Sequence, residues 1–178
     1  ISRGYGKADV ITANNVFAHV HDLDELIRSV KILFKSTGVF IIEVPYLRDF
    51  IEKNLFDTVY HEHLSHLCLK SLSILFRRHA MKIFDVERVA PHGGSIRVFI
   101  KKAGAPVKIS ANVKKLLREE RGLGLHSHET YAQFAKQIRR NKIQLTKILH
   151  DLKIQGKRIV GFGAPAKGNT LLNYFGIG

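Results

Sequence analysis

At 178 residues, 45% of them hydrophobic, the chain is long enough for one globular domain with a full core, or one domain and part of another. Its single cysteine, Cys68, excludes a disulfide framework, and the lack of a secretory signal or a membrane-length apolar run predicts a cytoplasmic protein. The formal net charge of +14 suits nucleic acid, an anionic membrane or a phosphate-bearing small molecule, so its location along the chain matters.

The first part of the chain has the pattern of a strand, a helix and a second strand with short connections. Residues 8–13 are a β-branched apolar run, typical of a buried parallel strand. Asp22 or Asp24 can cap the helix that follows, in which apolar residues recur at helical spacing up to Phe34. We expect Gly38 to end this helix and residues 39–44 to form the next strand. Such a βαβ unit predicts a parallel sheet.

Further elements follow in the order helix, helix and hairpin. A short helix is expected over residues 47–54 and a longer one over residues 69–80, which makes His79 a surface residue. Residues 82–89 and 95–102 alternate apolar and polar side chains and are joined by a Pro-Gly turn, as in an antiparallel hairpin. Cys68 is expected to be a small buried residue.

The last third of the chain is basic and helical before it becomes glycine-rich. Helices are predicted over residues 113–121 and 129–152, and residues 101–158 hold 15 Lys/Arg against four Asp/Glu, with His150 on the surface. A strand is predicted over residues 157–162, followed by a glycine-rich turn and another helix. A helix that starts after such a turn offers free backbone N–H groups to an anion, and Lys167 adds positive charge.

Three polar clusters are expected at one edge of the sheet. Ligand sites in open parallel sheets lie beyond the carboxyl ends of the strands. Asn14, Asn15 and His19 follow the first strand, and Glu43, Pro45 and Tyr46 close the second. The segment Tyr60-His61-Glu62-His63 returns to the same edge after the short helix. His61, His63 and His66 could ligate a metal, but no second ligand cluster supports that reading, so no metal site is predicted.

Four motifs together resemble the nucleotide-sugar C-methyltransferases. They are Asn-Val-Phe-Ala-His-Val-His-Asp (15–22), Phe-Asp-Thr-Val-Tyr-His-Glu-His-Leu-Ser (56–65), His-Gly-Gly-Ser-Ile-Arg-Val (92–98) and Gly-Ala-Pro-Ala-Lys-Gly-Asn-Thr-Leu-Leu-Asn-Tyr (163–174). The resemblance covers nearly the whole chain. It implies S-adenosylmethionine-dependent methylation of a carbon of a dTDP-4-keto-deoxysugar.

The resemblance also implies a domain order. In that family a zinc-binding segment and a glycine-rich S-adenosylmethionine loop precede this region, so the chain is expected to be an internal fragment, with zinc bound only in the segment absent here. Residues 1–104 would be the second half of a Rossmann-like α/β methyltransferase core ending in the hairpin. Residues 105–156 would be a helical connector, and residues 157–178 the start of a Rossmann-like nucleotide-sugar domain.

Site residues are carried over by position from the same resemblance. His63 matches the general base that removes a proton beside a ketone, and Tyr60 and His19 match residues that line the same pocket. Glu62 sits beside His63, and all four are expected to be catalytic. The substrate-binding residues expected are Asn15, His92, Lys167 and Asn169, and those for the cofactor are Asn14 and Asn15. The partner expected is a dTDP-sugar or similar nucleotide sugar, with neither membrane nor nucleic acid involved.

Two alternatives stay open from the residues. The basic charge would suit an RNA methyltransferase. A non-catalytic module that only binds a sugar nucleotide would also carry the same pocket. The oligomeric state and the identity of the sugar are not indicated by the sequence.

Overall fold

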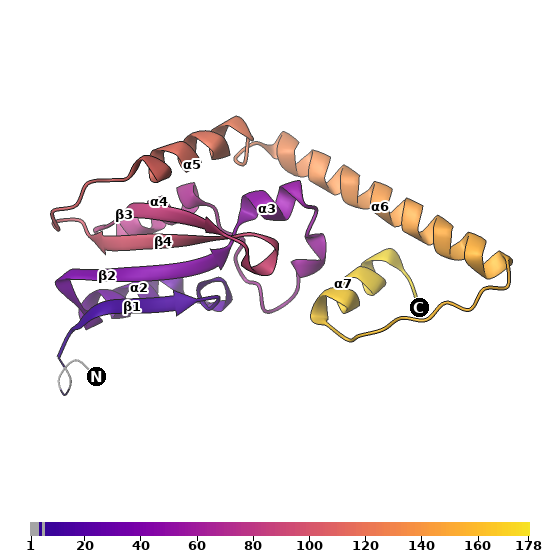
Figure 1. Ribbon diagram of the computed structural model, residues 1–178, viewed down its shortest axis with the longest axis horizontal. Coiled ribbons are helices and arrows are strands. Elements are labelled where there is room, and N and C mark those ends of the chain that lie inside the picture. Colours follow the sequence, from indigo (N-terminus) through magenta and orange to yellow (C-terminus); the bar gives the residue numbers. More distant parts are fainter. Residues whose placement is uncertain (1–3, 5) are drawn as a thin grey trace.

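The computed structural model describes residue 4 and residues 6–178 and confirms the predicted α/β class (Figure 1). Strand β1 (Ala8–Asn14), helix α2 (Leu23–Leu33) and strand β2 (Phe34–Pro45) form a βαβ unit in which the strands are parallel. Strands β3 (Met81–Val89) and β4 (Ser95–Lys102) form the predicted hairpin, and β4 pairs antiparallel with β2. The sheet order is β1-β2-β4-β3. Residues 1–3 and 5 of the predicted first domain lie outside the described part.

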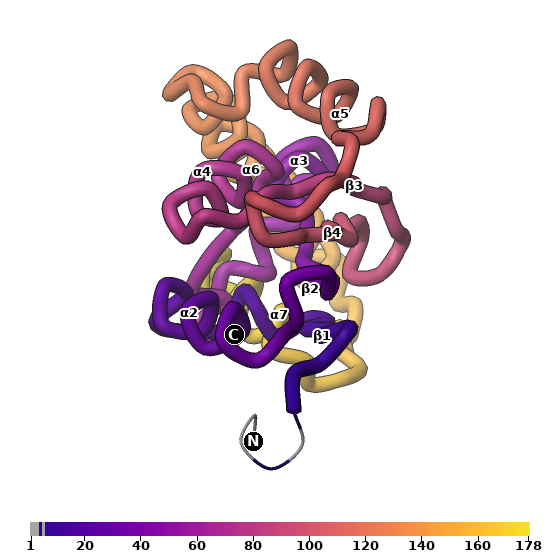
Figure 2. Tube along the Cα trace, turned by 90° about the vertical axis from the view of Figure 1, so that its left-hand side faces the viewer, coloured from indigo at the N-terminus to yellow at the C-terminus, as the bar shows by residue number. Residues whose placement is uncertain are grey.

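Helices α2 and α4 (Leu69–Arg78) cover the same face of this sheet (Figure 2). Beneath them, the rings of Phe17, Phe40 and Phe76 meet at centroid distances of 5.9 to 6.4 Å and form the centre of the core. Short helical elements connect the strands: η1 (Phe17–His19), α3 (Leu47–Glu52), η2 (Phe56–Thr58) and η3 (Pro91–Gly93).

The remaining helices lead away from the sheet. Helix α5 (Ala111–Gly122) packs on β3 and α4, and the long helix α6 (His128–Ile154) extends beyond the sheet (Figure 1). Helix α7 (Ala166–Phe175) turns back and packs against η2. Within residue 4 and residues 6–178, no helix combines the length and apolar character needed to cross a membrane.

The predicted helix cap at Gly38 is wrong, because α2 runs directly into β2. Gly38 is buried inside β2, and a Cβ atom there would lie 2.9 Å from Phe34 Cδ2 and 3.0 Å from the Asp9 carbonyl oxygen. The glycine therefore permits a close approach of β2 to β1. At the other end of the helix, Asp22 is the N-cap, and its side chain accepts a hydrogen bond from Glu25 N at 2.8 Å.

The strand predicted over residues 157–162 is also wrong. The segment is exposed coil, and the side chain of Phe162 is fully exposed. A strand needs a neighbour to bond its N–H and C=O groups, and none of the described strands lies alongside this segment. The helix predicted after it is confirmed as α7.

His79 is not the surface residue that was predicted. Its side chain is only 12% exposed, and its Nε2 is hydrogen-bonded to Asp24 Oδ1 where α2 meets α4. Lys31 Nζ donates to the His79 carbonyl at 2.8 Å, so the two helices are joined at two places. The hydrogen bond from His79 lowers the pKa of Asp24. His150, by contrast, is exposed as expected.

Candidate active site

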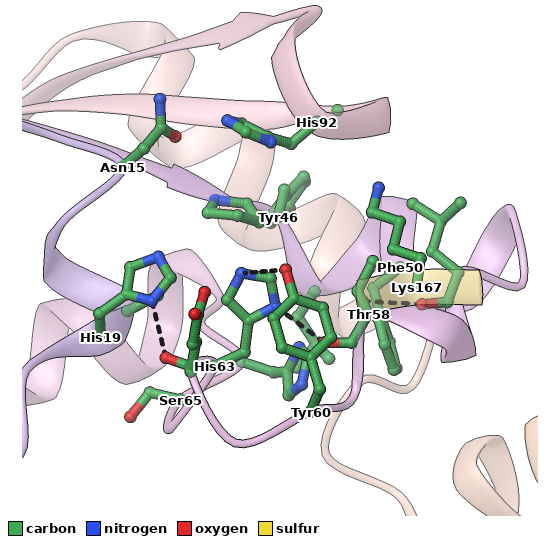
Figure 3. A pocket seen from close by; sticks show the side chains of 17 residues that line it. Asn15, His19, Tyr46, Phe50, Thr58, Tyr60, His63, Ser65, His92 and Lys167 are labelled. Carbon is green, nitrogen blue, oxygen red and sulfur yellow. Dashed lines mark hydrogen bonds between the residues drawn. The ribbon is translucent and has the colours of Figure 1, made fainter. Parts of the chain in front are cut away.

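The carboxyl ends of β1 and β2 open into a cavity of about 260 Å³ (Figure 3). Its walls come from the end of β1 with η1, the end of β2 with α3, residues 55–66, the hairpin turn and the start of α7. The cavity brings together the predicted residues Asn15, His19, Tyr60, Glu62, His63, His92 and Lys167.

Asn14 and Asn169 do not line this cavity. Asn14 is exposed and faces Glu43 in the β1–β2 ladder. Asn169 is on α7, where its side-chain and backbone oxygens both accept from Asn173 Nδ2 at 2.8 Å. Asn169 is therefore exposed like Asn14, although it belongs to the matched motif of residues 163–174.

The backbone fixes the orientation of His63. Its Nδ1 lies 2.7 Å from the Thr58 carbonyl oxygen. A carbonyl can only accept, so Nδ1 carries the proton and, in the neutral imidazole, Nε2 carries the lone pair. The Tyr60 hydroxyl is 3.5 Å from that Nε2, and the backbone turn between the two residues is closed by a bond from His63 N to Tyr60 O at 3.0 Å. The turn therefore presents a basic nitrogen beside a phenol.

His19 is held in the same way. Its Nδ1 donates to the Glu62 carbonyl oxygen at 2.7 Å, so its Nε2 is also free of a proton in the neutral form. The rings of His19 and His63 lie 4.9 Å apart, with Tyr60 on the far side of His63 (Figure 3). The backbone carbonyls of Glu62 and Thr58 therefore orient two histidines that lie far apart in the sequence.

Tyr60 and Glu62 differ in exposure. Partial burial, together with the charges of Glu62 and Asp57, raises the pKa of Tyr60, which keeps its hydroxyl protonated near neutral pH. The Glu62 side chain is 59% exposed, and its Oε1 lies 3.9 Å from His61 Nε2. His61 itself is 87% exposed and does not line the cavity.

His66 lines the cavity, although its only indication from the sequence was as a possible metal ligand. Its ring packs on Phe50 with a centroid distance of 4.5 Å, and its Nε2 is buried with no hydrogen-bond partner in the described part of the chain. Burial, and then the nearby His63, lower the pKa of His66. A His66 that stays neutral limits the positive charge next to His63.

Tyr46 forms a wall of the cavity and links it to helix α5. The Tyr46 hydroxyl donates to Glu120 Oε1 at 2.9 Å, and burial raises its pKa. Glu120 is fully buried and also accepts from the backbone N–H groups of Leu69 and Lys70 at 2.6 and 3.0 Å. This carboxylate therefore caps α4 and fixes Tyr46 at once.

A possible metal-ligand cluster lies outside the cavity. The ligand atoms of Cys68, Glu120 and His126 lie within 4.8 Å of one another. Cys68 is buried, as predicted. The hydrogen bonds that Glu120 accepts already account for its burial without an ion.

Comparison with known proteins assigns both halves of the chain. Residues 90–178 match the family model described as the C-methyltransferase C-terminal domain, and residues 1–83 match that of a methyltransferase domain. The chain is 37% identical over 178 residues to the C-methyltransferase NovU of Streptomyces niveus, a match that covers all of this chain and 42% of NovU. It thus spans less than half the length of this curated relative.

Among solved structures, the chain aligns with the B. subtilis M1A22 tRNA methyltransferase TrmK. The TM-score is 0.35 and the identity is 13%, over 96% of this chain and 60% of that one. A similarity at this level carries no functional information.

Proposed function

This chain belongs to the C-methyltransferase family, and we propose that it carries the substrate side of an enzyme that methylates a carbon of a 4-keto-deoxysugar nucleotide, such as a dTDP-sugar. The observation that carries the proposal is the fixed orientation of His63. Its Nδ1–H is held by the Thr58 carbonyl, and its unprotonated Nε2 lies 3.5 Å from the Tyr60 hydroxyl in the wall of the cavity.

The chemistry of C-methylation requires such a nitrogen. A carbon becomes nucleophilic when the ketone beside it allows a proton to leave. In the proposed step the C–H bond breaks, the proton goes to His63 Nε2, and the electron pair moves onto the ketone oxygen as an enolate. Tyr60, whose hydroxyl stays protonated, is positioned to donate a hydrogen bond to that oxygen.

Residues at the end of β1 fit a methyl donor. Asn15 Oδ1 is buried in the cavity wall with no partner among the described residues, so a polar group of a bound molecule would satisfy it. Asn15 would therefore contact S-adenosylmethionine, whereas Asn14, also predicted to bind it, lies outside this cavity. When bound, S-adenosylmethionine supplies the electrophilic methyl group.

The nucleotide end of the substrate is assigned to the start of α7. Lys167 lies in the first turn of this helix and lines the cavity, and the N-cap Pro165 provides no side-chain bond to the first N–H groups. Free N–H groups and an ammonium at one place suit a diphosphate. His92, across the cavity in the hairpin turn, is proposed to contact the sugar.

The test measures proton abstraction separately from methylation, in the full-length protein. His63→Ala should slow methyl transfer by about 10²–10⁴-fold. It should slow the exchange of the substrate's α-proton with deuterium, measured without the methyl donor, by about the same factor. The neighbouring His61→Ala is the matched control, because His61 is exposed and outside the cavity, and it should leave both rates unchanged. Deuterium exchange that survives His63→Ala would exclude His63 as the base and pass the role to His19 or Tyr60.

A further inference from the structure

Helix α7 meets the turn that carries His63 through an aromatic contact. The ring of Phe56, in η2, stacks on Phe175 at the end of α7 with centroids 5.3 Å apart and planes inclined by 14°. Phe175 is buried, at 4% exposure, although the neighbouring Tyr174 is half exposed. Neither Phe56 nor Phe175 lines the cavity. The stack therefore acts on the site through the elements that it joins.

Each side of this stack ends at a residue of the proposed active site. On α7, the helix axis leads from Phe175 back to Lys167, whose side chain lines the cavity. On η2, Phe56 is two residues before Thr58, whose carbonyl accepts a hydrogen bond from His63 Nδ1. The cation proposed for the nucleotide and the carbonyl that sets the His63 tautomer are thus connected through Phe56, whose ring stacks on Phe175 and lies 5.9 Å from that of Tyr174.

The segment that leads into α7 is exposed, whereas Lys167, Gly168, Thr170 and Leu171 of the helix are partly buried. Residues 155–166, which lead into the helix, are all exposed. At the other end, Lys142 of α6 donates to the Tyr174 carbonyl at 2.7 Å and lies 5.4 Å from the Tyr174 ring. Aromatic and hydrogen-bond contacts therefore anchor the C-terminal end of α7, while Lys167 in its first turn lines the cavity.

We propose that the Phe56–Phe175 stack is a joint that couples nucleotide binding at Lys167 to the orientation of His63. When the stack is intact, α7 holds η2 in the conformation that aims the Thr58 carbonyl at His63. Ligand binding at Lys167 holds α7 in place and so favours the same conformation of the turn. Phe56 and Phe175 are positioning residues, and the inference rests on the proposed function for the identity of the ligand.

A double-mutant cycle in the full-length protein tests the joint, with thymidine diphosphate as the probe and calorimetry as the measurement. Phe175→Ala should weaken binding of the probe by about tenfold, the effect of losing a well-packed aromatic pair. In a Lys167→Ala background the same change should add almost nothing, because the stack acts on the nucleotide through Lys167. Leu172→Ala, at a half-exposed position on the same helix, is the control and should have no effect. Effects of Phe175→Ala and Lys167→Ala that multiply fully would overturn the proposal.

Amide hydrogen exchange measured without any ligand tests the Phe56–Phe175 joint separately from the proposed function. Phe175→Ala should accelerate amide exchange within residues 56–66 and leave the β3–β4 hairpin unchanged. Phe175→Leu, which keeps most of the apolar volume, should give a smaller effect of the same kind and serves if the alanine variant does not fold. Unchanged exchange in residues 56–66 would overturn the joint whatever the substrate is. Failure of the wild-type protein to bind thymidine diphosphate would instead contradict the proposed function.

Discussion

The histidines of the cavity differ in the hydrogen-bond partners of their ring nitrogens. His19 and His63 each donate from Nδ1 to a backbone carbonyl, which leaves Nε2 as the basic atom in both. His66 has a hydrophobic neighbour instead and a buried nitrogen without a described partner. The same residue type is therefore prepared as a proton acceptor at two positions and kept neutral at a third.

The lowered pKa of His66 predicts a pH dependence of stability. The folded protein takes up this proton only below the ordinary value of 6.5, whereas the unfolded chain takes it up at that value. The stability that His66 contributes is thus full above pH 6.5 and is lost as the pH falls through the window between 6.5 and the lower pKa of the folded state. His66→Phe, which keeps a ring against Phe50, should remove this loss. Urea unfolding at about pH 7.5 and about pH 5 measures the difference in unfolding free energy between the two pH values.

A matched comparison is provided by His61, which is 87% exposed. His61→Phe should leave the wild-type difference between the two pH values in place. If His66→Phe loses as much stability at the lower pH as the wild type does, another group is responsible for the dependence.

At the scale of elements, the hairpin turn is pressed against α3. Gly94 has φ +138°, and a Cβ atom there would lie 2.3 Å from Asp49 Cγ. Asp49 is buried and paired with Arg88 and Lys53 at 2.6 and 2.8 Å, so it has little room to move. Tyr46 N donates to the Gly94 carbonyl at 3.0 Å, which joins the turn to the cavity wall.

Gly94→Ala should therefore destabilise the protein by about 2–4 kcal/mol, from backbone strain and the clash with Asp49 together. Thermal or urea unfolding of the full-length protein measures the change. Gly104→Ala is the control, since nothing lies within 4 Å of the added carbon, and it should change the free energy of unfolding by less than about 0.5 kcal/mol. Equal effects of the two substitutions would show that the close approach at Gly94 can relax.

The elements that sequence predicted best are those with a regular apolar pattern. The βαβ unit and the hairpin were recognised from the runs in β1, β2, β3 and β4, and α4 to α6 from helical spacing. The errors depended on tertiary partners. Gly38 is needed because another strand is close, none of the described strands lies beside residues 157–162, and His79 meets Asp24 from a distant helix.

The candidate site shows the same division. The sheet-edge argument and the resemblance placed Asn15, His19 and His63 correctly in one cavity. The contribution of Thr58 was not predictable, because it comes from a backbone carbonyl and leaves no trace in the residue type. From the sequence Tyr46 is only the end of a strand, and its position in the cavity wall depends on the buried Glu120 of α5.

For the whole molecule, the positive charge occurs in two settings. Lys167 is at the cavity, where a ligand is partly shielded from solvent. Helix α6 instead exposes Lys136, Arg139 and Arg140 on the surface. With a net charge of +14, the molecule is expected to attract any polyanion, whatever its substrate. Attraction of RNA therefore does not by itself identify an RNA substrate.

The two settings respond differently to salt, and that difference separates the sugar-nucleotide proposal from the RNA alternative. Single-stranded RNA held by about three exposed cations should lose about twentyfold in affinity when salt rises from about 50 to about 200 mM, because condensed counterions are released on binding. Thymidine diphosphate, held at Lys167 within the cavity, should lose much less. Replacing Lys136, Arg139 and Arg140 by Glu should abolish RNA binding and leave the diphosphate affinity unchanged. Fluorescence anisotropy follows the RNA, and calorimetry follows the diphosphate. RNA that still binds tightly at the higher salt and competes with the diphosphate would show that the cavity belongs to an RNA methyltransferase.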